Sequence, residues 1–438
     1  MRRSVFSTMT VLVGGALLAL AAQPASGAGF LIFEHGSKAM GMAGAFTAQA
    51  DDGSAMWHNA GGLAFQKERA FDVGTTLISN TTGDFEGLGP FPGTGASGEQ
   101  KDAIFFPSHV YYVQPLAPNW TFGLGFNDPF GLVVEWDDVN DWPGRFISYK
   151  AELRTFDLNP TLAWQATPNL GIGVGAIVRW SDLELNRRVG VPSPFGGAAE
   201  VADVRLESDL EEGYGWNVGI LHKVNPSFSW GLAYRSDMTI DYEGDARFTQ
   251  ISTGVPAFDA AVAAQLPFGR NVPVATSVDY PDLAMLGLAF GLTPNLVLET
   301  DVQWTGWSAF KELPIDFPET PQFSEVIPER YEDAYAYRAG LAWTTSPKSQ
   351  WRFGYVFDET PQPEQAVGPL LPDADRNGVT LGYGYRGGWD FDIALMYLEF
   401  DKRTRDETFQ TAPGEAPEPI FHGTFDTTAV LLGMTIGF

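Results

Sequence analysis

The stretch FDLNPTLAWQATPNLGIGVGAIVRW, residues 156–180, decides the fold. Apolar residues occupy every second position in its first half, from Phe156 to Trp164, and again from Leu170 to Trp180. Thr167-Pro168-Asn169 separates the two halves. Because successive side chains of a strand point to opposite faces, this pattern predicts an antiparallel hairpin with one apolar side. Each arm has about the 9–11 residues that a tilted strand needs to cross a bilayer. Unpaired strand edges are not tolerated in hydrocarbon, so the remaining chain must close the sheet.

The first residues have the features of an export signal. Arg2-Arg3 form a basic start, residues 11–22 an apolar segment, and Ser26-Gly27-Ala28 a small-residue cleavage site. We therefore predict a signal peptide over 1–28 and a mature start at Gly29, with a cut one residue earlier as the alternative. The apolar segment is shorter than the roughly 20 residues of a membrane-spanning helix, and no later stretch supplies one. Membrane residence must then come from strands.

Composition excludes several classes of site. The chain has no cysteine, which excludes disulfides and thiolate metal ligands. Its net charge is −27, and about −29 without Arg2 and Arg3, so the surface repels nucleic acid. This charge fits a solvated acidic exterior or, alternatively, a cation-binding surface. The five histidines lack metal-ligand spacing, and we expect no metal and no cofactor. Ser108 and His109 are adjacent and point to opposite faces of one strand, so no catalytic pair, and no enzyme, is expected.

Fourteen strand candidates follow an irregular N-terminal segment. Residues 29–69 are rich in small residues and lack alternation, which predicts a compact hatch, or plug, in the lumen; a periplasmic extension is the alternative. The barrel is predicted over 70–438. Its strands are expected near 70–80, 103–114, 119–127, the two arms of the opening hairpin, 203–223, 227–240, 279–292, 295–305, and then around Tyr335, Trp351, Val379, Trp389 and Val430.

The connections alternate between short and long. Turns such as 115–118, 167–169, 224–227 and 293–295 are followed by loops over 128–152, 184–202, 241–278 and 306–332. Short periplasmic turns and long external loops are typical of outer-membrane barrels, whereas a soluble sandwich has no reason to keep this order. The chain ends on an alternating strand with a terminal Phe438, which resembles the signal read by the barrel assembly machinery.

Several segments resemble the FadL/TodX-type family of outer-membrane transporters for long-chain fatty acids and aromatic hydrocarbons. They are the Gly29-Phe30 start, SAMWHNAGGLAF (54–65), NDPFGL (127–132), VQWTGWSAF (302–310), and WRFGYVFDETP followed by LPDADRNGVTLGYGYR. The resemblance implies an all-β, fourteen-stranded antiparallel transmembrane barrel, an N-terminal hatch and a side opening in the wall. In place of the Asn-Pro-Ala of the family's hatch, this chain has Asn59, Ala60 and Gly61. Loss of proline's fixed φ and gain of glycine predict a less rigidly held hatch.

Candidate ligand contacts come from three regions. External loops carry Phe258 and Leu266 in a stretch (255–266) with helical spacing, and we expect them to form a capture groove or, equally, to pack on neighbouring loops. Phe30 and Phe33 follow the predicted mature start. Inward-facing Arg179 and Arg338 could anchor a carboxylate, although such charges more often pair with acidic residues across a barrel interior. The lumen-facing glycines of the third strand, Gly123 and Gly125, are the candidates for the side opening.

The sequence thus predicts an outer-membrane protein that takes up hydrophobic small molecules passively, with long-chain fatty acids as the first candidate. Aromatic or alkane hydrocarbons are the alternative substrates, and a surface adhesin or structural barrel is the alternative function. The expected surroundings are membrane lipid and lipopolysaccharide, and a monomer is expected.

Overall fold

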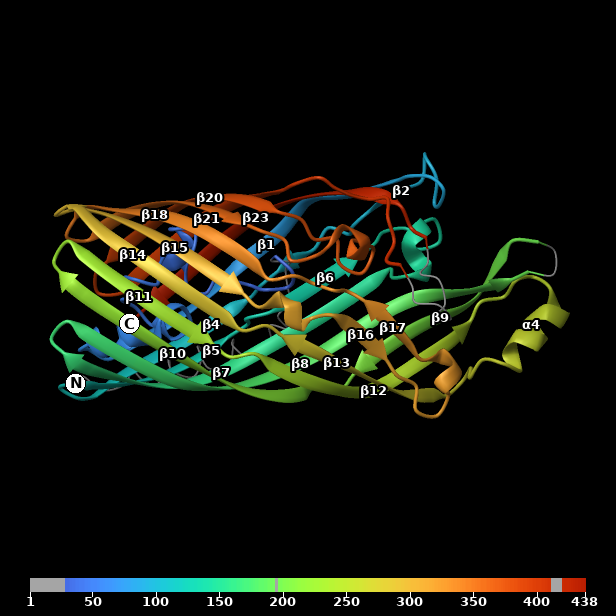
Figure 1. Cartoon of the computed structure of the whole chain (residues 1–438), viewed down its shortest axis with the longest axis horizontal. Helices are drawn as coiled ribbons and strands as arrows, with labels where there is room; N and C mark the ends of the chain where they lie inside the picture. Colours follow the sequence, from blue (N-terminus) through green and yellow to red (C-terminus); the bar gives the residue numbers. More distant parts are fainter. Residues whose placement is uncertain (1–27, 194–195, 411–419) are drawn as a thin grey trace, which may run out of the picture.

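Fourteen wall strands close into one antiparallel barrel in the computed structural model, which describes residues 28–193, 196–410 and 420–438. Each wall strand pairs with its neighbour in the chain, and the first pairs with the last from Asp72↔Gly437 onward. Figure 1 shows the barrel along its length, with the C terminus at the end that carries the short turns. The predicted fold is confirmed. Residues 1–27 of the predicted signal peptide lie outside the described ranges.

Nine of the wall strands are single elements, and five are interrupted or extended. The single ones are β1 (Ala70–Gly87), β7 (Lys150–Thr167), β8 (Leu170–Pro192), β15 (Leu296–Thr305), β18 (Ala334–Ser346), β19 (Ser349–Asp358), β20 (Arg376–Arg386), β21 (Asp390–Phe400) and β23 (Gly423–Gly437). The others are β4 (Ser108–Ala117) below β3 (Ile104–Phe105), β5 (Trp120–Asn127) with β6 (Gly131–Glu135), β9 (Ala198–Ser208) with β10 (Glu211–Asn225), β11 (Phe228–Arg235) with β12 (Met238–Gln250), and β13 (Asn271–Tyr280) with β14 (Leu283–Thr293).

The remaining elements belong to the hatch and the external end. The hatch contains α2 (Ser37–Met40), α3 (Ala55–His58) and the 3-10 helix η1 (Ala60–Phe65). The external end carries β2 (Ser97–Glu99), η2 (Pro143–Phe146), α4 (Pro256–Ala263), η3 (Trp307–Ala309), β16 (Glu312–Ile315), η4 (Pro321–Phe323), β17 (Glu325–Pro328), η5 (Glu364–Ala366) and β22 (Arg403–Arg405). Among the described residues, no helix has both the length and the apolar character needed to cross a membrane.

The opening hairpin forms as predicted, but its arms are longer. Only Pro168 and Asn169 separate β7 from β8, which have 18 and 23 residues. The predicted lengths of 9–11 residues and the predicted loop over 184–202 are therefore wrong. The reason is that both strands continue above the membrane, where β8 pairs with β9. Figure 1 shows β8, β9, β12 and β13 projecting as one sheet toward the tip helix α4.

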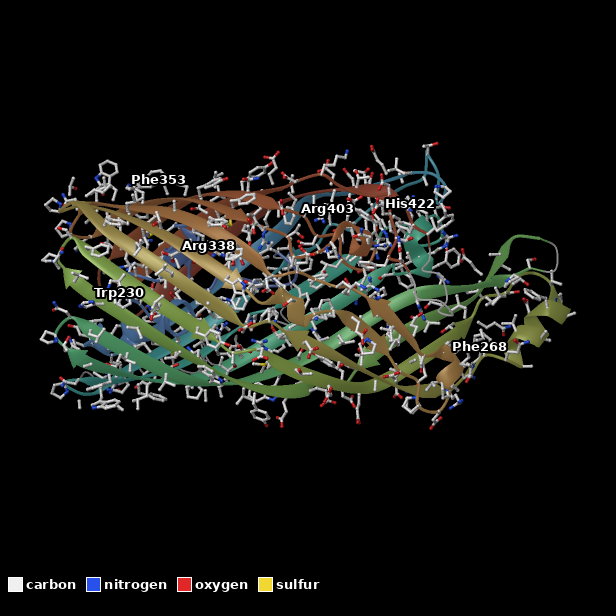
Figure 2. The ribbon with its side chains drawn as sticks, viewed as in Figure 1. Trp230, Phe268, Arg338, Phe353, Arg403 and His422 are labelled. Carbon is white, nitrogen blue, oxygen red and sulfur yellow. The ribbon has the colours of Figure 1, made fainter. Side chains whose placement is uncertain are left out.

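Alternation separates the two faces of the lower wall. On β5, Thr121 and Asn127 are buried, while Trp120, Leu124 and Phe126 are exposed on the outer face. Figure 2 shows the same arrangement for Phe353, which lies on the outer surface, whereas Arg338 lies within the barrel. An apolar outer band with aromatic residues near its edges is what a bilayer requires of a barrel wall.

The polarity of the two faces is reversed in the projecting sheet. On β12, Ile240 and Tyr242 are buried on the inner face, and Asp241 and Glu243 are exposed. The outside of this region faces water, so charged side chains turn outward and apolar ones inward. The predicted loop over 241–278 is consequently strand for much of its length, and only residues 251–270 form the tip.

The segment before β1 fills the lower lumen. Almost all of residues 28–64 are buried, although none belongs to a wall strand. Inward carboxylates hold its backbone: Asp301 accepts hydrogen bonds from the amides of Phe46 (3.0 Å) and Thr47 (2.9 Å). From β20, three wall strands beyond β15, Thr380 donates to the carbonyl of Gly41 (3.0 Å). Residues 28–65, which end with η1, are called the hatch below.

Candidate ligand-binding site

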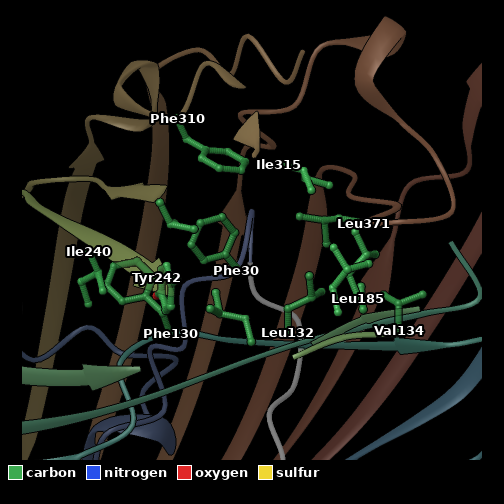
Figure 3. Packing of buried hydrophobic residues seen from close by; sticks show 14 of the residues in the cluster. Phe30, Phe130, Leu132, Val134, Leu185, Ile240, Tyr242, Phe310, Ile315 and Leu371 are labelled. Atoms are coloured by element: carbon green, nitrogen blue, oxygen red, sulfur yellow. The ribbon is translucent and has the colours of Figure 1, made fainter. Parts of the chain in front are cut away.

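An apolar cavity lies inside the barrel above the hatch. It comprises about 840 Å³ of space between atoms, part of which is open to solvent. Its walls come from nearly the whole chain, and Figure 3 shows several of these side chains facing one another. The apolar lining includes Phe30, Leu132, Leu153, Leu183, Leu185, Leu206, Tyr242, Val274, Val278, Phe310, Leu313, Ile315, Tyr331, Leu370 and Leu371. Burial of apolar surface contributes about 25 cal/mol per Å², so this space suits an alkyl or aryl group.

Phe30 forms the floor of the cavity. Its ring lies 4.7 Å from that of Trp307 and 5.4 Å from that of Phe310, both nearly edge-on, and 5.9 Å from Phe130 and Tyr280. Edge-to-face aromatic pairs at these distances are stabilising. The hatch's first residues therefore lie between the cavity and the lower lumen.

A buried ion pair lies directly beneath this floor. Arg179 donates to both oxygens of Asp157 (2.7 and 2.9 Å), and its guanidinium lies 4.5 Å from the ring of Phe130. A second cation, Arg235, is 3.6 Å from Asp157 and lies over the ring of Trp57. Arg179 is therefore paired and does not line the cavity. This geometry does not support the prediction that Arg179 anchors a substrate carboxylate. It fits the alternative prediction, that Arg179 pairs with an acidic residue inside the barrel.

Arg338 lies in a different cluster, below the cavity and against the hatch. Its guanidinium is 5.0 Å from the ring of Phe33 and donates to Gln303 (3.2 Å). Neither Arg338 nor Phe33 lines the cavity. Of the two hatch phenylalanines proposed as ligand contacts, the structure thus places only Phe30 there.

The predicted loop residues lie at the projecting tip. The stretch predicted to be helical forms α4, but Phe258 and Leu266 are half-buried against the tip's own packing and do not line the cavity. Other aromatic residues of the two long loops pack on one another, with Phe248 at 5.7 Å from Phe323 and 6.2 Å from Phe317. The alternative prediction, that these loops pack on their neighbours, matches the observed contacts better than a separate capture groove.

The residues at the Asn-Pro-Ala position are held tightly. The Asn59 amide donates to the carbonyls of Thr47 (2.8 Å) and Ile220 (3.0 Å), and its oxygen caps η1 by accepting from Gly61 (3.0 Å). A Cβ added to Gly61 would lie 2.7 Å from the backbone nitrogen of Leu221. Gly61 is thus required by close approach of the hatch to the wall. Ala60 and Gly61 fit directly against wall backbone, and a less rigidly held hatch stays a prediction.

Buried titratable groups accompany the hatch. Burial lowers the pKa of His58 to about 3, with nearby Arg338 acting in the same direction. Burial likewise lowers the pKa of His35, whose ring lies 4.0 Å from that of Trp57 and is tilted by 51° against it. Burial raises the pKa of Glu34, although the nearby arginines oppose this shift. Burial thus disfavours the charged form of each of these groups as long as the hatch stays packed.

The wall ladder is interrupted at residues 128–130, beside the cavity. β5 pairs with β7 up to Asn127↔Asp157, and β6 resumes pairing at Gly131↔Arg154. Three residues, 128–130, therefore face only two residues of β7, 155 and 156. On the other edge, pairing of β4 with β5 also ends at Asn127. Residues 30–32 of the hatch cover this bulge, with Ile32 N–H donating to the Pro129 carbonyl (2.9 Å) and Gly131 N–H to the Phe30 carbonyl (2.8 Å).

Gly123 and Gly125 do not mark this interruption. They pair with Val113 and Tyr111 of β4 and with Thr161 and Asn159 of β7, within continuous ladders. The ladders leave no opening at the two glycines themselves, but both lie on β5, the strand predicted to border the side opening, and β5 ends at the break. Their missing side chains instead make room for Met56 of the hatch, whose sulfur lies 2.7 Å from the Cβ that Gly123 would carry. Asn-Asp-Pro ends the alternation at 127–129, but this ending does not distinguish a break within the wall from the end of a strand.

The comparisons with known proteins agree with this architecture. The family model described as "Outer membrane protein transport protein (OMPP1/FadL/TodX)" matches residues 18–438. The chain belongs to this family. A long-chain fatty acid transport protein of Escherichia coli O6:H1 is 23% identical over 410 residues, covering 88% of this chain and 90% of the relative. Outer membrane protein P1 of Haemophilus influenzae is 24% identical over 423 residues, covering 87% and 88%.

Solved structures give the same fold. A Pseudomonas aeruginosa FadL homologue matches with a TM-score of 0.80 at 20% identity, covering 94% of this chain and 99% of that one. The Pseudomonas putida toluene transporter TodX matches with a TM-score of 0.69 at 17% identity, covering 93% and 99%. This FadL/TodX-family protein is located in the outer membrane, where its strands cross the bilayer many times. Its family consists of transport proteins rather than enzymes.

Proposed function

We propose that this FadL/TodX-family barrel takes up hydrophobic small molecules passively, without chemical change to the ligand. The observation that carries the proposal is the apolar cavity above Phe30, closed below by the hatch and flanked by the wall break at 128–130. A ligand held in the cavity could leave sideways through the break once residues 30–32 withdraw from it. Neither step needs an aqueous pore, which would offer nothing to an apolar solute.

Long-chain fatty acids are the first substrate class, because relatives named as fatty acid transporters match most of the chain. One observation favours a second class, neutral hydrocarbons such as the toluene carried by TodX. The charged residues that line the cavity are Glu152, Glu184, Glu207, Glu243 and Glu329, and the lining contains no lysine, arginine or histidine. Glu243 turns outward on β12, and Glu152 and Glu184 pair with Lys150, so these carboxylates do not decide the substrate class. The missing cation does: a fatty acid anion finds no basic partner in the lining, whereas an uncharged ligand needs none.

Uptake into proteoliposomes tests the proposal. A radiolabelled fatty acid, its methyl ester and an alkane of equal length are compared, with protein-free vesicles as the control. Saturable uptake of any of the three supports transport, and a preference for the ester and the alkane identifies the neutral class. Uptake no faster than in protein-free vesicles contradicts the transport function. Large steady channels in planar bilayers would indicate a general porin instead.

The remaining partners are part of the same proposal. We expect a monomer in contact with membrane lipid and lipopolysaccharide, assembled by the barrel assembly machinery through Phe438. The side chain of Phe438 is exposed and lies 5.7 Å from Trp389, while its backbone exchanges hydrogen bonds with Phe71 of the first strand. A Phe438→Ala variant should reach the outer membrane in lower amounts, measured by fractionation, and unchanged amounts would refute this role.

A further inference from the structure

The ladder between the sixth and seventh wall strands is interrupted halfway up the barrel. β10 pairs with β11 as far as Asn217↔Arg235, and one more backbone bond joins Ser236 N–H to the Trp216 carbonyl (2.9 Å). Pairing resumes at Ser208↔Gly244, where β9 meets β12. Between these points residues 210–215 face residues 237–242, and within these described segments no ladder pairing joins them. Their other edges are paired, with β8 and β13 respectively.

Side chains fill the gap that the ladder leaves. Met238 and Ile240 point inward from β12 and are buried. A Cβ on Gly213 would lie 2.7 Å from Ile240 Cγ1, and one on Gly215 would lie 2.8 Å from Met238 Cε. The two glycines therefore make space for these two apolar side chains. The wall is closed here by packing, which a rotamer change can undo, and not by backbone hydrogen bonds.

This gap lies at the outer edge of the apolar band. Tyr214 and Trp216 project from it on the outer face and are 65% and 49% exposed. Aromatic residues of this kind lie at the membrane interface. Paired registers place Gly213 opposite Arg179, Arg179 opposite Asp157, and Asp157 opposite Asn127, where the 128–130 break begins. Both interruptions thus lie on one register line, three wall strands apart.

The gap also adjoins the cavity. Tyr242, two residues after Ile240, lines the cavity, and Figure 3 shows both side chains near Phe130 and Phe30. The Tyr242 hydroxyl lies 2.7 Å from Ser181 Oγ and 2.8 Å from the Tyr280 hydroxyl. Ser181 belongs to β8, beyond the gap, so these hydrogen bonds hold the inner side of β12 against the neighbouring wall.

We propose that residues 210–215 and 237–242 form a second lateral port, which joins the cavity to the outer leaflet of the membrane. Met238 and Ile240 are its gate, and the Tyr242 hydroxyl bonds keep that gate closed. Hydrophobic molecules already dissolved in the outer leaflet reach the cavity through this port without passing the projecting external loops. The proposal rests on the proposed uptake function and names one of its routes.

A reversible cross-link tests the port, because the chain has no cysteine of its own. The variant Gly213→Cys/Ile240→Cys places one sulfur near the position of Ile240 Cγ1, so oxidation should fix the gate shut. The matched control is Ile220→Cys/Leu232→Cys. It links the same two wall strands at two residues that are already ladder partners, outside the gap. Each variant is compared with its own reduced form, which also reports whether it folds.

The readout is labelling of cavity residues by a diazirine-bearing alkane dissolved in the lipid of proteoliposomes. Oxidation of Gly213→Cys/Ile240→Cys should slow labelling about tenfold, equivalent to ~1.4 kcal/mol of added barrier, and oxidation of the control pair should not. If the double variant does not fold, Ile240→Ala, which opens the gate, should speed labelling. Labelling that is equal in oxidised and reduced protein, or unchanged by Ile240→Ala, overturns the port.

Labelling and uptake separate this proposal from the proposed function. Wild-type vesicles that show no hydrophobe uptake contradict the transport function, and the labelling rates still decide whether the port exists. Normal uptake with labelling insensitive to the cross-link leaves transport in place and assigns membrane access to the 128–130 break alone.

Discussion

Removing the Asp301 carboxylate should release the hatch. This side chain is buried on β15 and accepts hydrogen bonds from the amides of Phe46 and Thr47. Hydrogen bonds to a charged acceptor contribute about 1.5–3 kcal/mol each, so Asp301→Ala should destabilise the docked hatch by ~3–6 kcal/mol. Relief of repulsion with Glu299, two residues away on the same face, offsets part of this loss.

Hydrogen exchange measured by mass spectrometry reads this change directly. Because each ~1.4 kcal/mol is a factor of ten, amides of residues 44–50 should exchange roughly 10²–10⁴ times faster in Asp301→Ala. Conductance in planar bilayers should rise in parallel. Thr300→Ala, an outward-facing neighbour on β15, is the control and should change neither. Exchange over 44–50 at the wild-type rate would refute the reasoning that wall carboxylates hold the hatch.

Three further predictions concern the hatch and the charge pair below the cavity. His35 and His58 have folded pKa values below the usual 6.5, so protonation favours the undocked hatch. Docking is fully stable above about pH 6.5 and should lose up to ~1.4 kcal/mol per histidine for each pH unit below it. Once exchange is divided by the intrinsic amide rate at each pH, the hatch amides should be less protected at pH 5 than at pH 7.5. Equal protection at both values contradicts this. Gly61→Ala introduces a Cβ against the Leu221 backbone and should cost about 1–3 kcal/mol in thermal unfolding; a neutral effect would show that the wall yields. Arg179→Ala leaves the Asp157 carboxylate poorly paired and should cost about 3–5 kcal/mol in detergent, and a loss under ~1 kcal/mol would show that Arg235 suffices.

Local pattern was enough to predict the wall. Period-two alternation, with Gly, Pro and Asn at the turns, gave fourteen strands and the inward or outward side of Trp120, Glu299 or Phe353 before any contact was known. The strand positions and the side that each residue faces depend only on neighbouring residues in the chain and on which face of the strand meets lipid. The same rule failed above the membrane. Charged residues such as Asp241 and Glu243 led to the prediction of a loop, whereas they form the outer face of a strand.

The cavity required the closed barrel. Phe30, Tyr242 and Leu371 lie far apart in the sequence and meet only because the last strand pairs with the first and the hatch enters the lumen. Arg179 and Arg338 share an inward-facing pattern, yet one is paired with Asp157 and the other packs on Phe33, which no spacing rule distinguishes.

The sequence by itself thus determined which residues face lipid, because that choice is made strand by strand through burial of apolar side chains. Only the tertiary structure decided where the wall is left unpaired, at 128–130 and between 210–215 and 237–242. Register between two strands depends on the bend and packing of both, and neither strand's own residues carry that information.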